Sequence, residues 1–204
     1  MTVMTRQIKC QWQLVAFILS VLISFSPAVR ADVVRQAQDW FANITTMRAD
    51  FTQIASDGSV AEGQIMMRRP SRLKIIYDGV PALNLITTSA WLHVDQPDER
   101  RVTSYPISET PLSLILTDPV SLRPAGFETI VNARAGGVTQ IVIYQDSGEG
   151  AGRLTLEFTD RPFQLRRWIV EDVVGIKTSL TLQNMVFGLP IENAEFSLPN
   201  YLHQ

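Results

Sequence analysis

Hydrophobic residues follow two different periods along the chain. Between residues 33 and 44 the apolar side chains return every three or four positions: Val33, Val34, Ala37, Trp40, Phe41 and Ile44. This spacing predicts one amphipathic helix over residues 32–44, with Asp32 available as its N-cap. After Thr45 the apolar residues alternate with polar ones, as they do in strands with one buried face.

Alternating segments separated by turn residues fill most of the remaining chain, and Asp57-Gly58 is a strong hairpin signal. The predicted strands span residues 47–53, 60–69, 73–77, 83–88, 91–95, 101–105, 128–134, 138–144, 153–158, 163–171 and 176–185. About eleven short strands at such intervals predict an antiparallel sandwich or barrel. Because no repeat or low-complexity linker interrupts them, we expect a single domain.

A short apolar segment stands between the two groups of strands. Residues 112–116 are almost entirely apolar, and Thr110-Pro111 before them predicts a short helix with Thr110 as N-cap. Both predicted helices are too apolar for free surface helices, so we expect them to cover the apolar face of the sheet. The enclosed space is then either an ordinary filled core or a lipid cavity. The residues alone favour the filled core.

The N-terminus has the three parts of a secretory signal peptide. Arg6 and Lys9 precede an apolar run of twelve residues, 14–25, and Ala31 is a suitable small residue before a cleavage site. A membrane-spanning helix needs roughly 20 apolar residues, so cleavage is the better interpretation of this run. We therefore expect residues 1–31 to be removed and residues 32–204 to form one domain. Cys10 lies before the apolar run, whereas the lipid-modified cysteine of a bacterial lipoprotein follows such a run.

Removing this peptide changes the composition of the chain. The full 204 residues are 46% hydrophobic and carry a net charge of −2, while the peptide contains three of the 18 basic residues and no acid. The remainder has 15 bases against 20 acids, a net charge of −5, and no cysteine. This balance argues against a nucleic-acid partner, a disulfide framework and a structural zinc site.

No reacting group has the setting that catalysis requires. His93 and His203 have no serine or cysteine partner in a recognisable motif, and His93 is expected on a strand facing solvent. The GxSxG and GxGxxG patterns are missing from the sequence. The sequence therefore predicts no enzyme activity, no cofactor and no metal.

Several short motifs, taken in order, resemble a known family. They are Phe51-Thr52-Gln53, Asp57-Gly58, Glu62-Gly63, Arg69-Pro70, Trp91 with Asp95-Gln96-Pro97, Thr110-Pro111-Leu112 and Ala194-Glu195-Phe196. Their order and spacing resemble the LolA family, the periplasmic carriers of outer-membrane lipoproteins. The resemblance covers essentially all of residues 32–204.

This resemblance implies a fold and a function. The fold would be mainly β, an open (unclosed) antiparallel β-barrel of about eleven strands, with a helical lid over an apolar cavity. The protein would be a periplasmic monomer that binds the acyl chains of lipoproteins. It would accept them from an inner-membrane ABC-type release complex and deliver them to an outer-membrane lipoprotein receptor, without covalent chemistry.

The resemblance also implies the residues that would do this work. The cavity-facing set is Phe41, Ile44, Leu73, Ile75, Trp91, Leu112 and Ile115. Leu73 and Ile75 stand where the family usually has large aromatic residues. Arg69 would gate the lid, because a guanidinium offers five donors in a fixed fork to the loop carbonyls of a closed lid.

Two other functions fit the same sequence. One keeps the fold and changes the cargo to a glycolipid or another envelope lipid. The other is a lipid-sensing regulatory domain that acts by binding a partner protein.

Overall fold

The computed structural model of the protein describes residues 27–145, 152–199 and 201. Residues 1–26 of the expected signal peptide therefore lie outside the described residues. The first described helix, α2 (Pro27–Asn43), begins five positions before the predicted start at Asp32 and ends one residue before Ile44. Its backbone thus runs through the last residues of the expected peptide.

Eleven strands follow α2, and they are interrupted once by the lid segment described below. In chain order they are β1 (Thr46–Ala55), β2 (Val60–Arg68), β3 (Arg72–Tyr77), β4 (Leu83–Thr87), β5 (Trp91–Gln96), β6 (Arg101–Pro106), β7 (Glu128–Arg134), β8 (Val138–Gln145), β9 (Gly152–Asp160), β10 (Phe163–Glu171) and β11 (Lys177–Phe187). Short 3-10 turns occur at η1 (Pro97–Glu99), η2 (Ile107–Glu109) and η3 (Asn193–Phe196), and α3 spans Ser113–Leu116.

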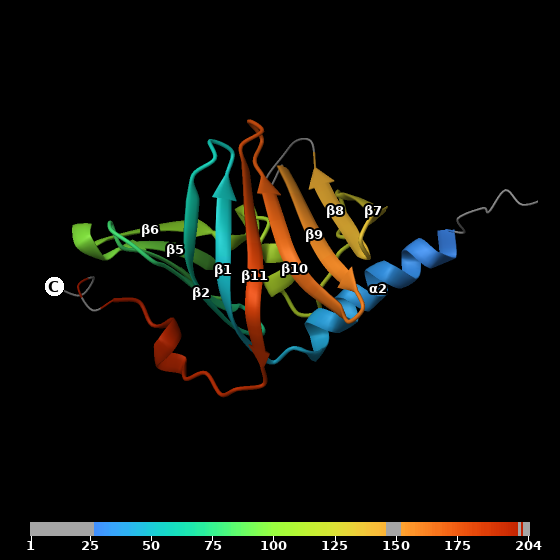
Figure 1. Cartoon of the computed structure of the whole chain (residues 1–204). Helices are drawn as coiled ribbons and strands as arrows, with labels where there is room; N and C mark the ends of the chain where they lie inside the picture. Colours follow the sequence, from blue (N-terminus) through green and yellow to red (C-terminus); the bar gives the residue numbers. More distant parts are fainter. Residues whose placement is uncertain (1–26, 146–151, 200, 202–204) are drawn as a thin grey trace, which may run out of the picture.

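All these strands form one antiparallel sheet in the order β6-β5-β4-β3-β2-β1-β11-β10-β9-β8-β7. The first and last strands of the chain, β1 and β11, pair at its centre, while β6 and β7 are its two free edges. The sheet is therefore strongly curved but not closed, and α2 crosses one end of it (Figure 1). The prediction of an open antiparallel sheet of eleven strands is confirmed.

The family motifs near the start of the sheet have local physical reasons. Gly58 has a positive φ of 82° in the β1–β2 turn, and the Asp57 carboxylate accepts a hydrogen bond from the Ser59 amide at 2.9 Å. Gly63 on β2 lies under the Phe51 ring, where an added Cβ would stand 2.0 Å from the Ile76 carbonyl oxygen. A larger side chain at position 63 would push β2 and β3 apart.

The inner face of the sheet carries one continuous hydrophobic core. On the β1–β3 side it includes Phe51, Ile65, Met67, Leu73 and Ile75, and on the β8–β11 side Ile141, Ile143, Leu154, Leu156, Phe158, Leu165, Trp168, Leu180 and Leu182. The apolar stripe of α2 packs into the same core through Val34, Ala37 and Phe41. The helix thus covers the inner face, as its sequence pattern predicts.

Part of the outer face of the β2–β5 region is covered by the C-terminal segment, defined here as residues 188–199 and Tyr201. Ile191 and Phe196 form a second, smaller apolar cluster with Met66, and Ile76 packs against it. Figure 1 shows this segment leaving β11 and running back along the sheet toward β5. The sheet is therefore covered on its inner face and, in part, on its outer face in this region.

Two local predictions are wrong. The helix predicted over residues 112–116 is present as α3, but Thr110 is not its N-cap, because the Thr110 hydroxyl donates to the Ile107 carbonyl. His93, expected to face solvent, is only 7% exposed, and its Nδ1 lies 2.8 Å from the Ser104 hydroxyl. Burial lowers the pKa of His93. The first outcome follows from a local hydrogen bond, and the second from the neighbouring strand β6, which carries Ser104.

Candidate lipid-binding interior and its lid

The connection between β6 and β7 forms a lid over the inner face of the sheet. We define the lid as residues 107–122, which include η2 and α3. Four of its apolar side chains are buried in the protein: Ile115, Leu116, Val120 and Leu122. All four belong to the same core cluster as the inner face of the sheet. The lid therefore fills the interior with its own side chains.

Most of the residues that the sequence assigned to the cavity do meet in this interior. Phe41 at the end of α2 and Leu73 and Ile75 on β3 are buried members of the core cluster. Ile44 and Ile115 are buried in it as well, and Leu112 is half-buried against it. Phe41 on α2 and Ile115 on α3, the residues Ile44 and Leu112 just outside these helices, and two residues of β3 thus come together.

Trp91 is the exception, and its assignment to the cavity is corrected by the strand register. Ile75 on β3 lies opposite Leu85 on β4, which lies opposite Val94 on β5, so these three side chains share the inner face. Trp91 is three positions from Val94 and therefore points to the outer face. Its side chain is 46% exposed. We therefore leave Trp91 out of the proposed lining.

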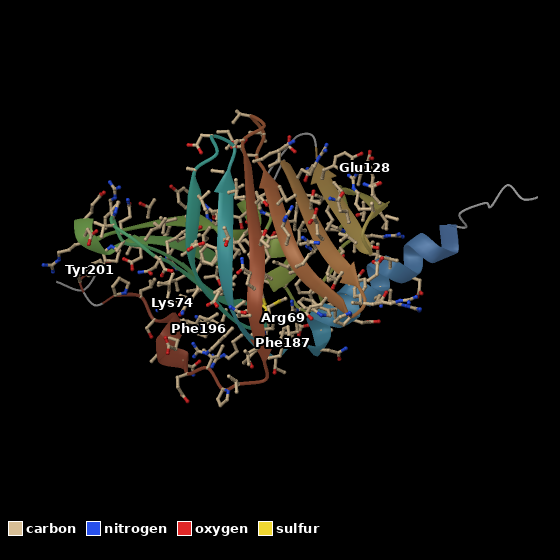
Figure 2. All side chains as sticks on the ribbon, in the orientation of Figure 1. Arg69, Lys74, Glu128, Phe187, Phe196 and Tyr201 are labelled. Carbon is tan, nitrogen blue, oxygen red and sulfur yellow. The ribbon has the colours of Figure 1, made fainter. Side chains whose placement is uncertain are left out.

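Arg69 lies just after β2 and binds the lid through main-chain oxygens. Its Nη1 donates to the Ile115 carbonyl, and its Nη2 donates to the Thr117 carbonyl at 2.8 Å. The carbonyl between them, that of Leu116, accepts a hydrogen bond from the Ser71 amide at 3.0 Å. We call these three contacts the lid latch. Arg69 lies at the end of the sheet near which the C-terminal segment leaves β11 (Figure 2).

The electrostatic setting of Arg69 suits this contact. Its side chain is only 5% exposed, and Asp118 lies 4.0 Å from its Nη2. Burial lowers the pKa of Arg69, while the Asp118 carboxylate opposes that effect. An arginine keeps its charge under these conditions, so its donors serve the two carbonyls at any physiological pH.

A further contact to the lid comes from α2, and nothing in the sequence analysis pointed to it. The Gln38 side-chain amide donates to the Val120 carbonyl at 3.0 Å. Gln38 is half-buried beside Ala37, next to the apolar stripe of the helix. A polar residue at the border of an apolar stripe is a sign that its side chain has a buried partner. The sequence could not identify that partner, because it lies 82 positions away.

Little free space remains beneath the lid. The pocket between the lid and the β7–β9 region has a volume of about 10 Å³. Its lining includes Pro111 and Leu114 from the lid and Ile143 and Leu154 from the sheet. Such a volume holds about one water molecule. An acyl chain can enter this interior only if the lid side chains move out of it.

No group of three or more potential metal ligands occurs among residues 27–145, 152–199 and 201. Within the same residues, no helix is long and apolar enough to cross a membrane.

Comparison with known proteins gives a family match and several structural ones. The family model described as "Outer membrane lipoprotein carrier protein LolA" matches residues 42–199. Among proteins with curated descriptions, none matches this sequence.

Three solved structures illustrate the structural likeness. An uncharacterized conserved protein from Thermus thermophilus is 8% identical with a TM-score of 0.52, over 83% of this chain and 94% of that one. A LolA superfamily protein from Nitrosomonas europaea is 8% identical with a TM-score of 0.48, over 82% and 97%. MucB is 10% identical with a TM-score of 0.49, over 84% of this chain and 63% of its own. At such identities the likeness concerns the fold alone.

Proposed function

The chain belongs to the LolA family of outer membrane lipoprotein carrier proteins, and on this basis we propose that it binds the acyl chains of lipoproteins and releases them to a receptor. In this proposal it works in the periplasm after removal of residues 1–31. It accepts lipoproteins from an inner-membrane ABC-type release complex and passes them to an outer-membrane receptor as a monomer. No covalent step is involved.

The observation that carries this proposal is the lid latch over an apolar interior. The lid is tied down by polar contacts to its main chain, while its buried side chains are aliphatic. Aliphatic side chains and acyl chains have the same requirement for a dry environment. Acyl chains can therefore take the place of Ile115 and Leu116 in the interior when the latch opens.

The energies involved favour a carrier of this design. Each methylene group removed from water gains about 0.8 kcal/mol, so several acyl chains together represent on the order of 30 kcal/mol. Free lipoprotein would not cross an aqueous compartment at that cost. A closed lid competes with cargo for the same interior and so lowers the net affinity for cargo. This competition would let the receptor draw the cargo out.

Substitution of Arg69 tests the role of the latch in release. Arg69→Leu removes two hydrogen bonds from a charged donor, each worth about 1.5–3 kcal/mol, and so weakens the closed state. We expect the variant to fold and load lipoprotein but to transfer it at least tenfold more slowly to a purified receptor. Arg68→Leu is the matched control, because Arg68 binds the C-terminal segment and not the lid. Transfer at the native rate by the Arg69 variant would overturn the proposed role.

Identification of the bound lipid tests the cargo itself. The protein purified from its native envelope would be extracted with organic solvent and the extract identified by mass spectrometry, together with any co-purifying lipoprotein. We expect triacylated lipoprotein. Glycolipid alone would replace the lipoprotein proposal by the glycolipid carrier, and a lipid-free protein that captures a partner protein would replace it by the sensor domain.

A further inference from the structure

Two cations stand side by side on the outer face of β3, the strand that η3 of the C-terminal segment also contacts. The register pairs Arg72 with Arg68 and Lys74 with Met66, and Met66 belongs to the outer cluster. Arg72 and Lys74 therefore point away from the barrel interior. Both side chains are half-buried, so their aliphatic stems lie on the sheet.

These cations lack the partners that other basic residues of this face have. Arg68 donates to the Ile191 carbonyl at 2.9 Å, and Arg48 lies 4.0 Å from Glu195. In the described part of the chain, neither Arg72 nor Lys74 forms an ion pair. Positive charge without a counter-charge is notable in a domain whose expected net charge is −5.

Trp91 completes this surface. It lies on the same outer face, and its backbone carbonyl accepts the Thr88 amide at 2.8 Å, which places it across β4 from the start of β3. Its indole is 46% exposed. We call Arg72, Lys74 and Trp91 the basic–aromatic face.

The basic–aromatic face adjoins both attachments of the lid. Ser71, next to Arg72, donates its amide to the Leu116 carbonyl of the lid. Ala90, next to Trp91, accepts the amide of Ile107 at the beginning of the lid at 2.9 Å. Whatever contacts this face therefore sits at the point where the lid would move.

The opposite end of the sheet differs in its chemistry. The β1–β2 and β10–β11 turns also expose apolar residues: Ile54, Val60, Val173, Val174 and Ile176. Their neighbours Asp57 and Asp172 are acidic, and Lys177 is paired with Glu171 at 3.6 Å. An anionic surface would be repelled there and attracted at the basic–aromatic face.

We propose that the basic–aromatic face is a contact surface for anionic phospholipid headgroups. Lysine and arginine bind the phosphates, and tryptophan prefers the headgroup level of a bilayer. A domain with net negative charge would then meet such a membrane in a preferred orientation, with the lid attachments at Ser71 and Ala90 beside the contact and the lid itself on the inner face of the sheet. This contact goes beyond the carrier function proposed above.

Vesicle binding tests this proposal. The purified protein would be co-sedimented with vesicles of phosphatidylcholine alone and with vesicles that also contain phosphatidylglycerol. We expect weak binding to the anionic vesicles only, and loss of that binding at high salt. Each basic residue near the surface contributes about fivefold in partitioning, so Arg72→Ser/Lys74→Ser should bind about thirtyfold less. A change in Trp fluorescence on binding should disappear in Trp91→Phe.

The control variant removes the same charge elsewhere. Arg134→Ser/Arg153→Ser changes two bases on the β7–β9 side and should bind anionic vesicles like the native protein. The proposal would be overturned if both double variants lost vesicle binding equally, or if the native protein bound neutral vesicles as well as anionic ones. It would also be overturned if Arg72 and Lys74 bound an acidic protein but not vesicles. Uptake of a fluorescent fatty acid without vesicles tests the carrier proposal separately from the membrane-contact proposal, because this uptake depends on the interior alone.

Discussion

The lid and the C-terminal segment are two irregular covers on opposite faces of the same sheet. Consecutive arginines at the end of β2 hold them. Arg69 donates to carbonyls of the lid on the inner side, whereas Arg68 donates to the Ile191 carbonyl and to the Asn193 side chain on the outer side. Because neighbouring residues of a strand point to opposite faces, one short sequence serves both covers.

The two covers differ in what holds them. The lid latch uses only main-chain oxygens of the lid, and the lid side chains enter the large inner core. The C-terminal segment is held by one main-chain oxygen, the Ile191 carbonyl, and also by its side chains. Phe196 packs on Met66, and the Arg68 guanidinium lies 5.6 Å from the Phe196 ring centre. In the proposed cycle acyl chains would therefore take the place of the lid side chains, while the C-terminal segment would stay on the sheet.

The largest effect should come from Phe196→Ala. A buried phenylalanine replaced by alanine costs about 3–5 kcal/mol, and we expect about 3 kcal/mol in the free energy of unfolding because this cluster is small. Fatty-acid uptake should not change, since the outer face is not the site. Urea denaturation and an uptake assay measure both quantities.

Phe187→Ala is the control for that variant, because Phe187 is an aromatic residue that is already 40% exposed. This substitution should lower the free energy of unfolding by much less than Phe196→Ala does. Faster uptake by Phe196→Ala would show that the two covers are not independent.

Ile115→Ala should have the next largest effect and the opposite pattern. We expect a loss of about 2 kcal/mol in the free energy of unfolding. The loss is at the low end of the usual range because the lid can move away from the space that the shorter side chain leaves empty. Uptake of a fluorescent fatty acid should become faster, because the closed state is the competitor of cargo. Stopped-flow fluorescence measures the rate.

Leu182→Ala is the matched control, since Leu182 is buried in the same core but belongs to β11. It should lower stability without accelerating uptake. If both variants take up lipid equally fast, the gain comes from general loosening of the core and not from the lid.

Gln38→Ala should have a smaller effect on the lid. It removes one neutral hydrogen bond to the Val120 carbonyl, worth about 1 kcal/mol. We expect slightly faster uptake and a small loss of stability. Gln36→Ala, at an exposed position of the same helix, should change neither. Hydrogen exchange of the lid amides would show whether the loss is confined to the lid.

The smallest effect concerns the end of the C-terminal segment at high pH. Burial and the hydrogen bond to Asp95 raise the pKa of Tyr201 to about 12 from an ordinary value of 10.0. A group with a raised folded pKa contributes stability that is complete below pH 10.0 and is lost as the pH rises through about 12. Tyr201→Phe should lack this decline. An identical alkaline profile in both proteins would contradict the predicted contact.

The sequence pattern predicted the secondary structure well because that pattern is local. Strand alternation and turn residues located all eleven strands, and the Asp57-Gly58 turn is where the sequence placed it. The same pattern placed Leu73 and Ile75 on one face, and that face is the inner one. Helix ends were less accurate: α2 begins five positions earlier than predicted, and Thr110 does not cap α3.

The candidate site was only partly predictable for the same reason. Arg69 was assigned to the lid through the family resemblance, and the structure does join it to carbonyls 46 and 48 positions away. Trp91 was assigned to the wrong face, because alternation says which residues share a face but not which face is covered. His93 was misplaced by the same ambiguity, and Gln38 gave no sign of its partner.

The strands, the amphipathic helix, the charge balance and the family were all readable in the amino-acid sequence. Packing in three dimensions established that the lid fills the interior, that adjacent arginines serve opposite faces, and that Trp91 lies outside beside two unpaired cations. Strand alternation and turns are properties of neighbouring residues, so they can be recognised along one dimension. The covers of a sheet are chosen by contacts between distant segments, which exist only after the chain has folded.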